Sequence, residues 1–303
     1  MALPADGSGS VYDEMVRRDE RAVPPGQVAI TDREFNELRQ FIHAHTGIAL
    51  SDHKRALVCS RLGKRLRAHG FKQYADYYQL LAENDPEEVE LGEMINAITT
   101  NKTDFFREPH HFKFLADELF PALRARTGER RLRLWSAASS SGEEPYSLAI
   151  TAFESFPDIN NWDLKILATD IDTNMLARGE NGVYNADHAA RIPEPLRKRY
   201  LLRGQGELGG RFMIKPELQS IVRFRRLNLM DNPWPMRGLF DVIFCRNVII
   251  YFDKATQRTL IDRLAHQLKP GGYLMLGHSE SLHGISTRFE FINHSIYRFS
   301  GNR

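Results

Sequence analysis

The sequence predicts an α/β fold, in which a doubly wound parallel sheet carries a small antiparallel β insert and follows an all-α domain. Three observations support this fold class. Helical periodicity alone runs from about residue 30 to 101, and strand-like and helix-like segments alternate from about residue 130 onward. One Gly-rich stretch near residues 200–229 interrupts this alternation with short β-like runs.

The composition is that of a chain with a substantial hydrophobic core. Of 303 residues, 42% are hydrophobic, and 41 basic against 39 acidic residues leave a net charge of +2, which argues against a general nucleic-acid binder. The two cysteines, Cys59 and Cys245, lie far apart, give no disulfide framework or zinc spacing, and fit a reducing cytosol. No apolar run approaches the ~20 residues that cross a bilayer, and no export signal is visible. We therefore expect a cytoplasmic protein without membrane insertion.

Changes in composition and periodicity predict the domain boundaries. Residues 1–27 are rich in Gly, Ser, Pro and charge and predict a flexible tail. Residues 28–100 predict a domain of four helices, and residues 101–129 a linker with a connecting helix. Residues 130–303 predict the α/β domain, with the β insert at about 197–229.

The first two helices carry recognisable start and stop signals. Thr31 with Glu34 forms a capping-box pattern before the first helix, and Gly47 ends it. The second helix is predicted to start at Ser51 and to stop at Gly70. Helical segments at 71–84 and 86–100 complete the domain.

The α/β domain reads as a series of strands, each followed by a helix. "RLRLWSA", "DLKILATDID" and "FDVIFC" are the first strand candidates, and the third is apolar enough to be central in a parallel sheet. "KATQRTLIDRLAHQLKPGGYLMLGHSE" reads as a helix, a Gly-Gly turn and a strand. In the insert, "FMIKP" and "VRFRRL" are assigned to a small sheet of about three strands.

The turn "SAASSSGEE" after the first strand is the first candidate for a ligand site. Small residues between a strand and a helix allow close approach to the backbone, but Glu143 and Glu144 would repel a phosphate. The turn lacks G-x-G-x-x-G, which disfavours NAD and FAD, and Asp170 ends the next strand where such folds bind ribose hydroxyls. A tight turn with exposed glutamates is the alternative. The combination favours a cationic nucleoside ligand, S-adenosylmethionine (SAM), whose ammonium group Glu144 can pair.

Five motifs in order resemble the chemotaxis-receptor glutamate methyltransferase family (CheR type). They are "ITTNKTDFFREPHHF", "SSSGEEPYSLA", "ATDID", "FCRNVIIYFDKATQ" and "LKPGGYLMLGHSESL". The resemblance covers the chain from about Ile30 onward. It implies a Rossmann-like SAM-dependent methyltransferase domain with a β subdomain, and S-adenosylhomocysteine (SAH) as the product.

The resemblance also implies roles for particular residues. Glu144 would bind the cofactor's amino group and Asp170 its ribose, and Asn228 and Leu229 would flank the adenine. The other cofactor residues implied are Asn101, Thr103, Arg107, Arg246 and Asn247. Arg246 could instead be a structural ion-pair partner of Asp170 or Asp172, and Arg107 an N-cap or a tie between domains.

The catalytic residues implied are Arg107, Arg246 and Tyr251. The nucleophile would be a receptor glutamate, which is already ionised at neutral pH because its pKa is near ~4.3, so no general base is needed. The arginines would position the cofactor and the carboxylate, and the Tyr251 hydroxyl would fix the angle of attack. His110 and His111 point about 100° apart on a helix, so we expect them to be structural and expect no metal.

The second helix of the N-terminal domain carries a basic stripe, Lys54, Arg61 and Arg65. Such a stripe is either a solvated face or a binding site for an acidic helix, and the resemblance favours a glutamate-rich receptor methylation helix. It also suggests a receptor C-terminal peptide at the β subdomain, where a structural flap is the alternative. We expect a monomer, recruited to membrane receptor arrays, that binds no nucleic acid.

Two other functions remain open from the sequence. One is a non-catalytic module that senses SAM while docking on a receptor, and retention of Arg246 and Tyr251 argues against it. The other is a methyltransferase for another protein, RNA or a small molecule, and the basic helix lacks the interleaved aromatic residues that RNA binding favours.

Overall fold

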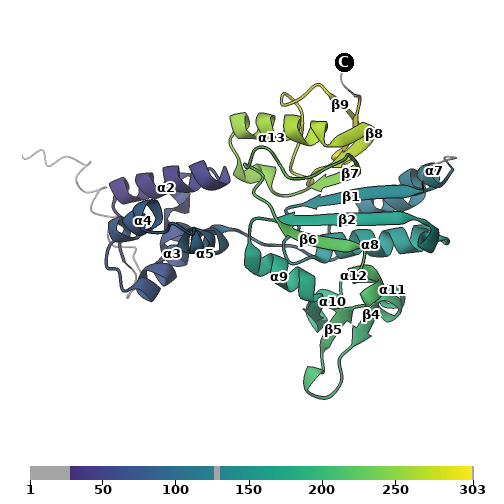
Figure 1. Cartoon of the computed structure of the whole chain (residues 1–303), viewed down its shortest axis with the longest axis horizontal. Helices are drawn as coiled ribbons and strands as arrows, with labels where there is room; N and C mark the ends of the chain where they lie inside the picture. Colours follow the sequence, from purple (N-terminus) through teal and green to yellow (C-terminus); the bar gives the residue numbers. More distant parts are fainter. Residues whose placement is uncertain (1–27, 126–129, 302–303) are drawn as a thin grey trace, which may run out of the picture. The chain divides into compact units, whose positions relative to one another are not determined.

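The computed structural model describes residues 28–125 and 130–301. The predicted tail at 1–27 lies outside the described residues. Among the described residues, the chain divides into two compact units, of which one contains residues 28–41 and 50–98 and the other residues 42–49, 99–125 and 130–301 (Figure 1). None of the helices in the described part combines the length and the apolar character that crossing a membrane requires.

The helical unit is built from the four predicted helices, except that the end of the first helix, residues 42–46, belongs to the second unit. They are α2 (Asp32–Thr46), α3 (Arg55–His69), α4 (Tyr74–Glu83) and α5 (Val89–Ile98), and a short 3-10 turn, Asp52–Lys54, precedes α3. The predicted capping box is confirmed, because the Thr31 N–H donates to Glu34 at 2.9 Å and the Glu34 N–H donates to the Thr31 hydroxyl at 3.3 Å. Gly47 and Gly70 follow their helices with φ of 73° and 72°, a conformation that suits glycine. Ser51 stands before the 3-10 turn, but its side chain makes no capping hydrogen bond.

The second unit contains a seven-stranded sheet in the order β6-β2-β1-β7-β8-β10-β9. Its strands are β1 (Arg131–Ala137), β2 (Asp163–Asp170), β6 (Val222–Arg226), β7 (Phe240–Cys245), β8 (Leu268–Met275), β9 (Phe289–Asn293) and β10 (Ile296–Phe299). The first five run parallel, and β10 and β9 add an antiparallel edge. The predicted central position of "FDVIFC" is confirmed, since β7 lies between β1 and β8 and is buried throughout. The Gly-Gly pair expected in a turn before β8 lies inside that strand, where the register with β7 shifts.

Helices cover the sheet on both faces. Those that follow the strands at its centre are α8 (Glu143–Ser155), α9 (Thr173–Asn181) and α13 (Lys254–His266), and the helical segment before β1 comprises α6 (Pro109–Phe114), a π turn (Leu115–Leu119) and α7 (Phe120–Arg124). Alternate residues of one strand reach different cores. Leu134 packs in the core with α8, whereas Trp135 packs in the core with α13. The strand period therefore fixes which of the two cores each side chain joins.

The small antiparallel sheet has three strands, as expected, but one of them was assigned wrongly. Its order is β3-β5-β4, with β3 (Val183–Asn185), β4 (Leu201–Arg203) and β5 (Arg211–Ile214), and short helices α10 (Ala186–Ala189), α11 (Glu194–Tyr200) and α12 (Pro216–Gln219) accompany it. The run "VRFRRL" does not belong to it. Residues 222–226 form β6, which pairs parallel with β2 at the edge of the large sheet. The third strand is instead the short "VYN", which lies before the predicted insert at 197–229.

Candidate functional site

The three predicted strand ends meet at one edge of the sheet. Ala137, the last residue of β1, lies opposite Thr169 of β2 and opposite Cys245, the last residue of β7. The turn after β1, Asp170 and the Arg246-Asn247 pair therefore leave the sheet side by side. This is the edge where open α/β sheets bind ligands.

The Ser-Gly turn folds back onto the end of β2. The Ser139 N–H donates to the Thr169 carbonyl at 2.8 Å, and the Ser140 N–H donates to the Asp170 carboxylate at 2.8 Å. Gly142 has φ of 97°, and a Cβ there would lie 2.9 Å from the Cα of Gly179. The turn therefore needs glycine at its end, and small residues let it close over Asp170. The buried Ser139 hydroxyl has no protein hydrogen-bond partner among the described residues.

Asp170 is buried and holds two loops. Besides the Ser140 N–H, its carboxylate accepts the Asp172 N–H at 2.9 Å. Burial raises the pKa of the Asp170 carboxyl to about 6, although these backbone N–H groups oppose the rise. A carboxylate that accepts two hydrogen bonds keeps lone pairs for further donors, such as the hydroxyls of a ribose.

Arg246 is the buried cation of this edge, with 2% of its side chain exposed. Its guanidinium lies 2.9 Å from Glu144 and 3.2 Å from Glu108, and it donates to the Arg107 carbonyl at 2.6 Å. Glu144 also accepts the Ser136 hydroxyl at 2.7 Å. Arg246 is an ion-pair partner, as the alternative held, but not of Asp170 or Asp172. Its partners are Glu144, in the first turn of α8, and Glu108, the residue before α6.

The two glutamates around Arg246 have opposite pKa shifts. Burial raises the pKa of Glu144 despite the charge of Arg246. Burial also acts to raise the pKa of Glu108, but the Arg246 charge and a hydrogen bond with His278 outweigh it and lower this pKa to about 2. The guanidinium is therefore shared between Glu108, which is firmly ionised, and Glu144, whose ionised form burial disfavours.

The segment before α6 brings the predicted linker residues to this edge. The Asn101 amide donates to Asp172 at 2.7 Å, and the Arg107 guanidinium donates to the Lys102 carbonyl at 2.7 Å while remaining partly exposed. Thr103 lies between them and is half-buried. The N-cap alternative for Arg107 is wrong, because Glu108 occupies the N-cap position of α6.

Asn228 and Leu229 follow β6 and are held in place by the backbone around them. The Asn228 amide donates to the His45 carbonyl at 2.5 Å and accepts the Met230 N–H at 3.0 Å. Leu229 is buried, and its carbonyl accepts a hydrogen bond from Arg263 at 2.9 Å. Both residues therefore stand in a fixed loop directly after the strand that neighbours Asp170.

Asn247 and Tyr251 lie on one loop after β7. Asn247 has φ of 58°, and its N–H donates to Glu280 at 2.8 Å. Tyr251 ends a 3-10 turn, Ile249–Tyr251, is half-buried, and its carbonyl accepts the Ala49 N–H at 2.8 Å. Glu280 was not singled out from the sequence. The available signal was an acidic residue in "GHSES", soon after the strand that became β8.

The expectation that His110 and His111 point too far apart to share a metal ion is wrong about the geometry. The two rings lie 4.2 Å apart between centroids, and ligand atoms of Glu108, His110 and His111 lie within 4.8 Å of one another. His111 Nε2 lies 3.0 Å from the His294 carbonyl and must donate to it, so Nδ1 carries the lone pair. The Arg246 guanidinium beside Glu108 would oppose a dication there. Metal-free chemistry therefore stays a prediction.

The basic stripe on the N-terminal domain is partly engaged within its own unit. Arg65 is ion-paired with Glu90 and lies 3.3 Å from Glu93, and Arg61 donates to the Ile98 carbonyl. Lys54 is exposed. Two of the three predicted receptor-binding residues thus have structural roles as well.

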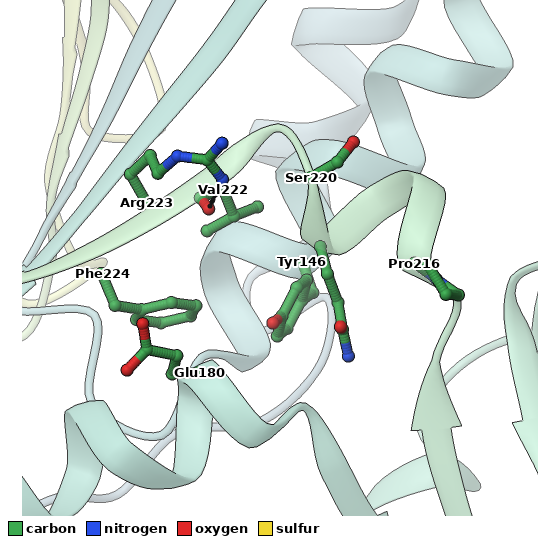
Figure 2. A pocket seen from close by; sticks show the side chains of 8 residues that line it. Tyr146, Glu180, Pro216, Ser220, Val222, Arg223 and Phe224 are labelled. Carbon is green, nitrogen blue, oxygen red and sulfur yellow. Dashed lines mark hydrogen bonds between the residues drawn. The ribbon is translucent and has the colours of Figure 1, made fainter.

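A surface pocket of about 320 Å³ lies away from the strand-end edge. Tyr146, Glu180, Pro216, Gln219, Ser220, Val222, Arg223 and Phe224 line it (Figure 2). Val222 and Arg223 begin β6, whereas Asp170 ends the neighbouring strand β2. The pocket contains none of the predicted site residues.

Comparisons with known families define the class of protein. The model of the CheR methyltransferase SAM binding domain matches residues 101–298, and that of the CheR methyltransferase all-alpha domain matches residues 33–99. The chain therefore has the two domains of a SAM-dependent methyltransferase. The matches cover both units that the fold shows.

Curated relatives agree with the family models over most of the chain. Chemotaxis protein methyltransferase 2 of Pseudomonas aeruginosa is 42% identical over 88% of this chain and 93% of its own length. The chemotaxis protein methyltransferase of Salmonella typhimurium is 39% identical over 100% of this chain and 99% of its own length, and that of Escherichia coli is 40% identical over 90% and 93%. This chain belongs to the CheR family of chemotaxis methyltransferases.

Proposed function

We propose that this chain transfers a methyl group from SAM to glutamate side chains of chemoreceptors, which gives glutamyl methyl esters for sensory adaptation. The observation that carries the proposal is the arrangement of charge at the strand-end edge. A buried arginine shared by two glutamates fixes the edge, and the neighbouring Arg107 presents a partly exposed guanidinium. The acidic groups suit a cationic cofactor, and the guanidinium suits a carboxylate substrate.

The buried polar groups of the edge fit this cofactor. Asp170 would accept the ribose hydroxyls, and Glu144 would accept the ammonium group with the lone pairs that Ser136 and Arg246 leave. The Ser139 hydroxyl is available as a further donor, since it is buried and has no hydrogen-bond partner within residues 28–125 and 130–301. Asn228 and Leu229 would flank the adenine, and the remaining contacts would come from Asn101, Thr103 and Asn247.

The proposed chemistry requires positioning more than proton transfer. When bound, SAM supplies an electrophilic methyl group on a sulfonium. Arg107 and Arg246 would orient the carboxylate and the cofactor, and the Tyr251 hydroxyl would set the angle of approach; such positioning contributes up to ~7–11 kcal/mol. Because the attacking carboxylate is ionised and no proton moves, neither a general base nor a metal ion is needed.

We propose that this chain is a cytoplasmic monomer that binds its receptors at membrane receptor arrays. In the N-terminal domain, the exposed Lys54 and the charge of Arg61 would face the acidic methylation helix. Arg65 would add less, because its charge is already paired with Glu90 and Glu93.

The small sheet offers a place for a receptor C-terminal peptide. Val183, Met213 and Leu202 lie opposite one another across its three strands and are 41%, 36% and 44% exposed. Their row is apolar, and Arg211 stands beside it on the same strand as Met213. Each outer strand, β3 or β4, also leaves an edge to which an extended peptide could add.

Methyl transfer to glutamate predicts a label with a distinctive stability. Receptor membranes incubated with this protein and radiolabelled SAM should gain label that mild base releases as methanol, as expected for an ester. Because the nucleophile is already ionised, the rate should be flat above about pH 6 apart from titrations of the enzyme itself. Base-stable label, or a rate that rises tenfold per pH unit through neutrality, would point to an amine substrate instead.

The ribose contact predicts a pH-dependent affinity. Since the pKa of Asp170 is raised to about 6, its carboxylate is present at neutral pH and becomes protonated as the pH falls through about 6. SAH affinity, measured by titration calorimetry, should therefore fall from about pH 7.5 to about pH 5, and Asp170→Asn should bind about tenfold more weakly at neutral pH without that dependence. Wild-type affinity in Asp170→Asn would remove this residue from the site.

The Tyr251 hydroxyl should separate turnover from cofactor binding. Tyr251→Phe removes one hydroxyl and keeps the ring that packs beside the α13 core. We expect kcat to fall by about ten- to a hundredfold while the Kd for SAH stays nearly unchanged. An equal loss in both quantities would assign the hydroxyl to cofactor binding.

Peptide tethering should affect KM alone. Deleting the receptor's C-terminal residues should raise the apparent KM and leave kcat intact, because a tether changes the effective concentration and not the chemistry. Met213→Asp, in the exposed row, should reproduce this effect on the full-length receptor. Identical kinetics on full-length and truncated receptor would exclude tethering and leave the small sheet as a structural flap.

A further inference from the structure

Glu280 forms an unusually complete set of backbone contacts for a buried side chain. It lies in the loop after β8 and is 5% exposed. Its carboxylate accepts four backbone N–H groups, from Gly277 at 2.6 Å, Asn247 at 2.8 Å, Ile249 at 3.0 Å and Ile250 at 3.4 Å. Burial raises the pKa of this carboxyl, and the four N–H groups act against the rise.

The four donors come from two different loops. Gly277 follows β8, whereas Asn247, Ile249 and Ile250 follow β7, the neighbouring parallel strand. The two loops approach each other closely, because a Cβ on Gly277 would lie 2.4 Å from the side-chain Nδ2 of Asn247 and 2.9 Å from Glu280 Oε2. One carboxylate therefore joins the two loops where they leave the sheet.

The loop that Glu280 holds carries the residues assigned to the chemistry. Asn247 stands at a positive φ of 58°, which costs a non-glycine residue free energy unless its surroundings fix it. Tyr251 follows Ile250 directly, and the Ile250 side chain is 50% exposed beside it. Glu280 thus fixes the backbone of this segment, while the side chains of Ile250 and Tyr251 remain at least partly accessible to solvent.

We infer that Glu280 is a positioning residue for methyl transfer, whose carboxylate fixes the Asn247–Tyr251 segment against the end of β8. The inference rests on the proposed function, because the segment matters to catalysis only if Tyr251 and Asn247 act there. An uncharged amide cannot replace this carboxylate. Each of its oxygens accepts two N–H groups, and the NH2 end of a glutamine would face two donors without an acceptor.

Glu280→Gln and Asp241→Asn form a matched pair that tests this role. Asp241 is also buried, at 8% exposed, and accepts the Arg133 N–H at 2.9 Å and Lys269 at 2.8 Å, but it lies at the start of β7. Both changes remove a buried carboxylate, at opposite ends of β7, so both should lower the melting temperature. Only Glu280→Gln should lower kcat, by about tenfold or more at a temperature where both variants are folded, with the receptor KM within about threefold of wild type. Equal kcat in the two variants would overturn the inference.

Amide hydrogen exchange tests the same contacts without the reaction. In Glu280→Gln, the amides of Ile249 and Asn247 should exchange faster than in the wild type, whereas amides in the centre of β7 should not. If Glu280→Gln does not fold, Glu280→Asp replaces it, because aspartate keeps the charge on a shorter side chain. This variant should show a lower kcat and faster exchange at Ile249 than the wild type. Wild-type exchange at Ile249 in a folded variant contradicts the positioning role. If these amides exchange faster in Glu280→Gln but the wild-type protein methylates no glutamate, the positioning contacts stand and the proposed function is contradicted.

Discussion

The geometry of the strand-end edge depends on the buried guanidinium of Arg246. It joins the backbone of Arg107, the side chain of Glu108 before α6 and the side chain of Glu144 in α8. An isolated buried charge is expensive, and removing one partner of a buried pair costs about 3–5 kcal/mol. The pairing therefore determines where two segments distant in sequence must lie. Around this guanidinium, two carboxylates stand against one cation.

Carboxylates at the ends of parallel strands also hold the loops that follow them. Asp170 accepts backbone N–H groups from the turn after β1 and from its own loop, and Asp172 caps α9 through the Asn174 and Met175 N–H groups. Glu280 does the same for the loops after β7 and β8. Each is an acid that fixes backbone where a parallel strand ends. Loss of activity in a variant of one of them therefore needs a stability control before it is read as a lost ligand contact.

Much of this architecture could be predicted from the sequence, because its signals are local. Apolar runs, each followed by a helix-like segment, predicted β1, β2 and β7, and the motifs after them predicted a ligand site at one edge of the sheet. The third strand of the small sheet was missed because "VYN" is too short to show a period. "VRFRRL" was misplaced because β6 is an edge strand with three arginines, a pattern that also fits a small antiparallel sheet. The sequence thus predicted that residues 222–226 form a strand, but local patterns could not show that this strand pairs with β2.

The contacts that the sequence could not predict are those made by long side chains across the chain. Glu108 lies 138 positions before Arg246 in sequence, and only the fold brings them together. His110 and His111 are adjacent in sequence, but the sequence did not predict that their rings approach each other while their backbone directions diverge on the helix. Helix geometry fixes where a side chain starts, but two or three rotatable bonds decide where its polar end lies.

Burial of the Asp170 carboxyl, which raises its pKa, lowers the stability of the protein at neutral pH. A carboxyl with a folded pKa of about 6 favours the protonated form, so its contribution to stability is largest below the unfolded pKa and is lost as the pH rises through about 6. At neutral pH the ionised group lowers stability by an amount on the order of 3 kcal/mol. A donor that binds the anion recovers part of this free energy. In the proposed ribose contact, hydroxyl donors would bind a carboxylate whose burial lowers stability, which is the trade expected where function opposes stability.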